Sequence, residues 1–319
     1  MILTVTPNVA IDRTVAVPNF RQGNRHRAVE SRTVVGGKGI NVARALALLG
    51  RPVVAAGLAG GPTGKRVIEE LAQESILADL TPIAEESRMN LSVVDPTSGE
   101  QTEINERGPE VSAEEVDAFV ERCEYLARGA SICVLAGSLP PAVEPDLYAR
   151  IVKDLADGGI VTVLDAEGEA MRAGLRAGPT VVAPNVLEAE ELVGHEFEGP
   201  ADLASGLAQL LEMGAGEAII TRPDGCVAAL GDPAEREYYE VTTETLEPVA
   251  AVGSGDAFLA GFVAARYEGA PARECLAYAV ACGAESTQHF GAGTVDAERV
   301  ERIRDEVEVR GLDVPVVIG

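Results

Sequence analysis

The sequence predicts a doubly wound α/β fold: a mostly parallel central sheet with helices on both faces, plus a small projecting β-sheet. Short apolar runs suited to buried strands alternate along the chain with segments of helical period, which is typical of βαβ units. Two other regions, about 11–35 and 88–106, alternate polar and apolar residues around turn signals, as antiparallel strands with one solvated face do. A half-exposed sheet beside a ligand cleft serves as a lid, a dimer surface or both.

The expected elements of the main fold follow one another in the order that a parallel sheet requires. A first strand is expected in MILTVTPN at the N-terminus. Further buried strands are expected at 53–59, 131–137, 160–166, 180–185 and 217–222, and helices at 113–128, 144–157, 186–194 and 201–213. Because no repeat, low-complexity segment or linker divides the sequence, we expect one domain over 1–319 with the two lid segments inserted in it.

Composition excludes several classes of protein. Hydrophobic residues make up 46% of the chain, so disorder is excluded, and no apolar run is long enough to span a membrane. The N-terminus lacks the basic flank of a signal peptide, which predicts a cytoplasmic location. Five cysteines without a CxxC pair and three scattered histidines argue against a disulfide framework and a zinc site. The net charge of −25 excludes nucleic acid and anionic membranes as expected partners.

The segment AAVGSGDAFLAGF, residues 250–262, sets two glycines and an aspartate at the start of an apolar helix. Asp256 could simply cap that helix, since the first N–H groups of a helix lack internal partners. The turn also has a chemical use, because Gly253 and Gly255 allow a tight backbone whose N–H groups point at an anion such as a phosphate. Whether Asp256 caps the helix or serves a phosphate site depends on the other motifs of the chain.

A second glycine-rich turn, VVGGKGINVARAL at 34–46, carries Lys38 in front of another helix. Exposed amides together with an ammonium group suit a phosphate or sugar hydroxyls. Neither this segment nor GGPTGKR at 60–66 is a Walker A loop, because the latter has Ala59 at the leading glycine and Arg66 where Ser or Thr would hold magnesium. GGKGIN also lacks the GxGxxG spacing of a dinucleotide-binding dehydrogenase.

Polar residues in three other places are candidates for ligand contacts. Asp12 follows the first strand and could accept bonds from sugar hydroxyls. Arg25 and Arg88 begin strands of the projecting segments, and an arginine fork suits a substrate phosphate. Asn185 and Glu188 have the spacing of a capping box, and they could equally hold the water shell of magnesium.

Taken together, these motifs resemble those of PfkB-type sugar kinases of the ribokinase-like superfamily, in particular the 1-phosphofructokinase and tagatose-6-phosphate kinase branch. The resemblance covers nearly the whole chain. It rests on the segments TPNVAID, NRHRAVESRTVVGGKGINVARAL, SRMNLSVVD, GEQTEINERGPEV, AGSLPPAV, LDAEGEAM, APNVLEAEEL, ITRPDG and VGSGDAFLAGF.

The resemblance implies a role for each matching residue. Asp256 would be the catalytic base, and the amides of Gly253, Ser254 and Gly255 would form the anion hole for the transferring phosphoryl group. Magnesium would be organised by Asn185 and Glu188, through water. The sugar would be held by Asp12, Gly37, Lys38 and Asn41; its existing phosphate by Arg88, Ser138 and, from a neighbouring subunit, Arg25; and the nucleotide by Asn185, Thr221, Arg222, Gly225, Gly253, Gly255 and Ser286.

Three positions depart from the family pattern. Ala183 stands where this branch has lysine, which removes a positive charge near the nucleotide phosphates and leaves Arg222 as its candidate replacement. Ala250 or Ala251 replaces the usual asparagine before the anion-hole turn, and Ala142 replaces a common glycine. These changes bear on the nucleotide donor rather than on the base.

The expected function is ATP-dependent phosphorylation of a ketohexose phosphate, in particular of fructose 1-phosphate to fructose 1,6-bisphosphate. Tagatose-6-phosphate kinase and 6-phosphofructokinase activities are the alternatives, and a sugar-phosphate sensor without turnover is the alternative of another class. Lys38, Arg25 and Arg88 favour a phosphorylated substrate over a neutral sugar or nucleoside. The implied cofactors are ATP and Mg²⁺, with K⁺ a further candidate, and the implied partner is a second copy of the chain, joined through the lid.

Overall fold

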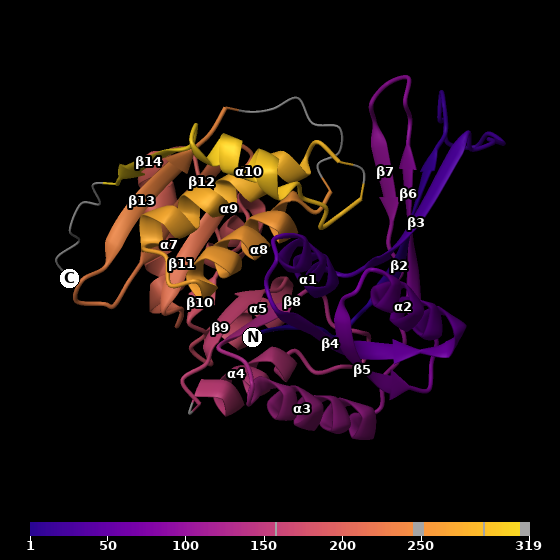
Figure 1. The fold of residues 1–319 in the computed structure, drawn as a ribbon, viewed down its shortest axis with the longest axis horizontal. Coiled ribbons are helices and arrows are strands. Elements are labelled where there is room, and N and C mark those ends of the chain that lie inside the picture. Colours follow the sequence, from indigo (N-terminus) through magenta and orange to yellow (C-terminus); the bar gives the residue numbers. More distant parts are fainter. Residues whose placement is uncertain (157, 245–251, 290, 313–319) are drawn as a thin grey trace.

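A ten-stranded sheet forms the centre of the molecule, within the residues that the computed structural model describes: 1–156, 158–244, 252–289 and 291–312 (Figure 1). The strands from β5 to β11 in the sheet order are parallel, and the three at the other edge are antiparallel. In spatial order the sheet comprises β14 (Glu308–Gly311), β13 (Glu237–Thr242), β12 (Gly225–Leu230), β11 (Glu217–Arg222), β10 (Val181–Val182), β9 (Val161–Asp165), β8 (Ile132–Ala136), β1 (Ile2–Thr6), β4 (Val53–Gly60) and β5 (Leu77–Ile83).

Helices cover both faces of this sheet and enclose two hydrophobic cores. Alternate residues of each buried strand enter different cores: in β8, Val134 packs in one and Leu135 in the other. One core is covered by α1 (Lys38–Leu48), α2 (Gly61–Gln73), α8 (Ser254–Tyr267), α9 (Ala272–Ser286) and α10 (Ala297–Arg304); the other by α3 (Ala113–Ala127), α4 (Leu147–Ala156), α5 (Gly168–Leu175), α6 (Val186–Val193) and α7 (Pro200–Glu212). The predicted doubly wound fold is confirmed, as are the strands and helices expected in it.

A separate four-stranded sheet projects from the body, as the two alternating segments predicted (Figure 1). Its order is β3 (Glu30–Gly36), β2 (Ala10–Ala16), β6 (Arg88–Val94) and β7 (Gln101–Ile104). Each segment forms an antiparallel hairpin, but the two hairpins join through β2 and β6, which are parallel. The expectation of antiparallel strands throughout is therefore wrong at this central pair, where strands far apart in sequence meet.

The order of the main sheet reverses at β1, which lies between β4 and β8. From there the chain builds toward one edge through β4 and β5, and toward the other through β8 to β11. Ligands of such sheets bind in the crevice beyond the carboxyl ends of the strands at this switch point. No helix in the described part of the chain is both long and apolar enough to cross a membrane.

Candidate active site

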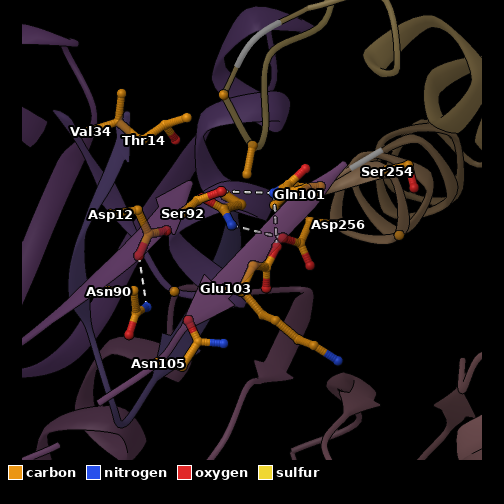
Figure 2. A pocket seen from close by; sticks show the side chains of 18 of the residues that line it. Asp12, Thr14, Val34, Asn90, Ser92, Gln101, Glu103, Asn105, Ser254 and Asp256 are labelled. Atoms are coloured by element: carbon orange, nitrogen blue, oxygen red, sulfur yellow. Dashed lines mark hydrogen bonds between the residues drawn. The ribbon is translucent and has the colours of Figure 1, made fainter. Parts of the chain in front are cut away.

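A cavity of about 460 Å³ lies where the carboxyl ends of the main strands, the small sheet and the first turns of α1 and α8 converge. Figure 2 shows Asp12 and Asn90 on the small sheet and Asp256 at the start of α8, around this cavity. Most of the residues singled out from the sequence line it: Asp12, Gly37, Lys38, Asn41, Arg88, Asn185, Glu188, Thr221, Gly253, Ser254, Gly255 and Asp256.

The turn before α8 depends on its two glycines in different ways. Gly253 has a φ of 83°, in the left-handed region that glycine adopts readily, and a Cβ there would lie 2.5 Å from that of Ala292. A Cβ on Gly255 would meet nothing within 4 Å, although this residue lines the cavity. The turn is therefore packed tightly behind Gly253 and open in front of Gly255, so a ligand has close access to the start of the helix.

Asp256 is held by another helix. Asp256 does not cap α8, because the N-cap position is Gly253 and no side chain makes a capping hydrogen bond there. Oδ2 of Asp256 instead accepts a hydrogen bond from Nδ2 of Asn41 in α1 at 2.8 Å. Burial raises the pKa of Asp256 to about 7, and the nearby carboxylate of Asp165 adds to this, while Lys38 and Asn41 oppose it. A carboxylate with a pKa near neutrality can both accept and release a proton at neutral pH.

Lys38 forms ion pairs with three carboxylates at the same edge of the main sheet. Its Nζ lies 3.0 Å from Asp165 at the end of β9, 3.6 Å from Glu167 and 3.3 Å from Glu188 in α6. Burial alone would lower the pKa of Lys38, but Asp165 and Glu188 outweigh it and raise the pKa above its ordinary value. The lysine is therefore charged. Sequence reasoning missed Asp165, although its position at the end of an expected strand was a usable signal.

Asp12 is fixed from the neighbouring strand. Its Oδ1 accepts from Nδ2 of Asn90 at 2.8 Å, and burial raises the pKa of the Asp12 carboxyl. A Cβ on Gly36 would lie 1.8 Å from Oδ2 of Asp12, so only glycine leaves the carboxylate its room. Within the described residues, the buried Oδ1 of Asn90 has no hydrogen-bond partner. An acceptor in this state suits a ligand hydroxyl.

Arg88 lines the same side of the cavity. Its Nε donates to the Asn8 carbonyl at 3.3 Å and its Nη1 to the Glu106 carbonyl at 3.0 Å, which fixes the guanidinium. Burial lowers the pKa of Arg88, against the effect of the Asp12 carboxylate. An arginine stays protonated under such a shift, so Arg88 is a fixed positive charge beside the cavity.

Asn185 and Glu188 form the capping box that their spacing allowed. Oδ1 of Asn185 accepts a hydrogen bond from the backbone N–H of Glu188 at 3.0 Å, and Oε2 of Glu188 accepts one from the backbone N–H of Asn185 at 2.9 Å. Both residues also line the cavity, near Asp165. Magnesium takes oxygen ligands, keeps several waters and binds through one or two carboxylates together with ligand phosphates. In the described part of the chain no three or more His, Cys, Asp or Glu residues form a group that could hold a metal ion, and Lys38 already pairs with Glu188 and Asp165. A magnesium ion beside these residues would therefore be held chiefly through water and ligand phosphates.

Other predicted site residues lie outside the cavity lining. Oγ of Ser138, just after β8, accepts from Asn8 Nδ2 at 3.4 Å. The expectation that Arg25 begins a strand is wrong: β3 begins at Glu30, and Arg25 is exposed in the loop between β2 and β3. Arg222 already pairs with Asp224 and Glu240, each at 3.2 Å. Gly225 opposes Arg222 at the start of β12, and the Oγ of Ser286, at the end of α9, donates to the Gly283 carbonyl at 2.8 Å.

The departures from the family pattern also have structural positions. Ala183 lines the cavity, which therefore has a methyl group where the family branch has a lysine. Ala142 has a φ of 65°, a left-handed conformation that explains why glycine is common there. Ala250 and Ala251 lie outside the described residues.

Comparisons with known proteins agree with this geometry. A family model described as pfkB family carbohydrate kinase matches residues 4–299. Phosphofructokinase-2 of Escherichia coli, solved with substrates and products, is 28% identical with a TM-score of 0.88, over 95% of this chain and 98% of that one. A Thermotoga maritima protein described as a possible 1-phosphofructokinase is 25% identical with a TM-score of 0.88, over 98% and 100%. Arabidopsis thaliana ribokinase, solved with ribose and ATP, is 21% identical with a TM-score of 0.74, over 95% and 98%, and shares the fold.

Proposed function

The chain belongs to the PfkB family of carbohydrate kinases, and on that premise we propose that it uses ATP to phosphorylate a ketohexose phosphate, with fructose 1-phosphate as the substrate. One observation carries the proposal. A buried carboxylate with a pKa of about 7, Asp256, stands at a glycine turn that a ligand can approach closely, in the same cavity as the fixed charges of Lys38 and Arg88. That combination suits transfer of a phosphoryl group to a hydroxyl of an anionic sugar.

In the proposed mechanism, Asp256 accepts the proton of the attacking hydroxyl. The hydroxyl oxygen then bonds to the γ-phosphorus of ATP while the bond to the β,γ-bridging oxygen breaks and ADP leaves. The amides of Gly253, Ser254 and Gly255 stabilise the negative charge on the transferring group, since amides at a helix N-terminus attract anions. Lys38 adds a positive charge. Magnesium, held through Glu188 and Asn185, would neutralise charge on the nucleotide phosphates.

The sugar phosphate is proposed to lie against the small sheet. Asp12 and Asn90 present acceptors to its hydroxyls. The fixed positive charge of Arg88 lines the same cavity, and this charge supports a phosphorylated substrate. Ser138 and the Arg25 of a second subunit complete the phosphate site in this proposal. The E. coli relative has been solved with fructose-6-phosphate, so 6-phosphofructokinase activity is the main competing outcome, with tagatose 6-phosphate as a further one.

Further parts of the proposal concern the whole molecule. The chain is one kinase domain over 1–319, the small sheet acts as its lid, and two copies associate through that sheet in the cytoplasm. Thr221, Arg222, Gly225 and Ser286 border the nucleotide. A potassium requirement is included because the E. coli enzyme has been solved with potassium.

A coupled ADP-release assay with MgATP tests the proposal. Fructose 1-phosphate, fructose 6-phosphate and tagatose 6-phosphate are compared at equal concentrations, with fructose as the unphosphorylated control. We expect the highest kcat/KM with fructose 1-phosphate. A preference for another sugar phosphate would reassign the substrate, whereas turnover of fructose alone would contradict the phosphate site at Arg88.

A further inference from the structure

A buried arginine outside the cavity lining, Arg44 in α1, occupies the space behind Asp256 and Asn41. Arg44 is 8% exposed and bonds to four different residues. Its Nη1 donates to Oδ1 of Asn41 at 3.1 Å and to the carbonyl of Ala292 at 3.2 Å. Its Nη2 donates to the carbonyl of Val35 at 2.8 Å. The guanidinium thus joins the end of β3, the helix α1 and the segment that packs behind Gly253.

From these contacts we infer that Arg44 is the positioning residue of the proposed phosphoryl transfer: it fixes the amide of Asn41 so that Nδ2 faces Asp256. The expected effect of Arg44 on turnover rests on the proposed function. Its expected effect on the orientation of Asn41 and on the pKa of Asp256 does not. Arg44 touches neither the cavity nor, in this proposal, either substrate.

Hydrogen-bond chemistry dictates the orientation of the Asn41 amide. An arginine has only donors, so the side that faces Arg44 must be the Oδ1 acceptor. The other end, Nδ2, then necessarily faces Asp256, whose ionised carboxylate has only acceptors. Without Arg44 the amide could rotate and present Oδ1 to the carboxylate, which would replace an attraction with a repulsion.

The guanidinium is itself anchored. Nε of Arg44 donates to Oε2 of Glu74 at 2.6 Å and Nη2 to Oε1 at 3.2 Å, a two-point contact at the C-cap of α2. Such paired contacts fix the plane of an arginine, which a lysine cannot reproduce. Glu74 thereby holds the fork that orients Asn41.

Arg44 also supports the turn before α8 from behind. Its bond to the Ala292 carbonyl holds the residue against which Gly253 packs. A Cβ on Gly293 would lie 2.4 Å from the Asn41 carbonyl, so this segment is wedged against α1. One side chain therefore positions both the carboxylate and the turn that carries it.

The direct test measures the pKa of Asp256 in the variants Arg44→Lys and Arg44→Met by NMR of protein labelled with ¹³C-carboxyl aspartate. The signal of Asp256 is identified by its absence in Asp256→Asn. The charged groups that act on this carboxylate are Lys38 of α1, Asp165 of β9 and Asp12 of β2, and both variants leave them in place. Loss of the hydrogen bond from Asn41 predicts an upward shift of about one unit in Arg44→Met. Arg44→Lys keeps the charge without the fork, so we expect a smaller shift in the same direction.

Arg266→Lys is the matched control, because Arg266 of α8 also pairs with a glutamate, Glu217, away from the cavity. We expect this variant to lose stability without moving the pKa of Asp256. In kinetics, the acidic limb of the kcat/KM profile should move with the measured pKa in the Arg44 variants alone. An unchanged pKa in both Arg44 variants would overturn the inference, even if their turnover falls. A shifted pKa in a protein that phosphorylates no sugar would leave the inference standing and refute the proposed function.

Discussion

Gly253→Ala probes the proposed anion hole most specifically, because the structure predicts a displacement rather than a general loss of stability. The new Cβ would lie 2.5 Å from Cβ and 2.7 Å from Cα of Ala292, whereas carbon atoms in contact prefer separations of about 3.5–4.0 Å. The new Cβ must therefore move by roughly 1 Å to reach an ordinary contact distance. The turn rather than Ala292 moves, because the hydrogen bond from Arg44 to its carbonyl holds Ala292. A misplacement of about 1 Å in a reacting geometry costs on the order of a hundredfold in rate.

Gly269→Ala is the control for the backbone cost. Gly269 follows the other end of α8 with a φ of 78°, close to that of Gly253, and a Cβ there meets nothing within 4 Å. Both variants pay about 1–2 kcal/mol for a left-handed alanine, but only Gly253→Ala moves the turn.

The assay compares kcat from ADP release with the free energy of unfolding from urea titration for both variants. We expect Gly269→Ala to keep nearly full kcat at its reduced stability, and Gly253→Ala to lose about a hundredfold in kcat. Equal kcat values in the two variants would refute the anion-hole role of this turn.

Three other outcomes are expected. The kcat/KM of the unmodified enzyme should rise with pH to a plateau, with a midpoint near the pKa of Asp256, about 7; a midpoint near 4 would contradict a buried base. Because burial raises that pKa from 3.8, the ionised carboxylate destabilises the folded state increasingly between pH 4 and 7. In urea unfolding, Asp256→Asn should therefore be roughly 1–4 kcal/mol more stable than the unmodified enzyme at pH 8, and no more stable than it at pH 4. Gly36→Ala should raise the KM for the sugar phosphate about tenfold or more without changing that for ATP, because its Cβ would lie 1.8 Å from Oδ2 of Asp12; an unchanged sugar KM would remove Asp12 from the site.

The main sheet was predictable because strands buried on both faces are apolar throughout. The runs at 131–137 and 160–166 became β8 and β9 within a residue or two at each end. The parallel pair of β2 and β6 was not predictable in the same way. Local alternation identifies a hairpin, but the joining of two hairpins is decided by contacts between residues more than 70 positions apart, such as Asp12 and Asn90.

The candidate site was partly predictable for a similar reason. Glycines beside Lys38 and Asp256 are visible as local motifs, and the fold brings them to one cavity. Asp165 and Arg44 belong to no such motif. Asp165 has only the weaker signal of its place at the end of a strand, and Arg44 lies within an apolar helix. Their importance comes from partners on other elements, which the sequence does not display.

The role of Asp256 as the base of a sugar-phosphate kinase is best tested by measuring kcat of Asp256→Asn together with calorimetric binding of the best sugar phosphate to this variant. Asparagine keeps the size of the side chain and can still meet Asn41 Nδ2, but it cannot take a proton. If Asp256 is the base, kcat falls by at least about a hundredfold, the lower range for general base catalysis, and the Kd for the sugar phosphate changes only a few fold. A kcat within about tenfold of that of the unmodified enzyme would contradict this role of Asp256.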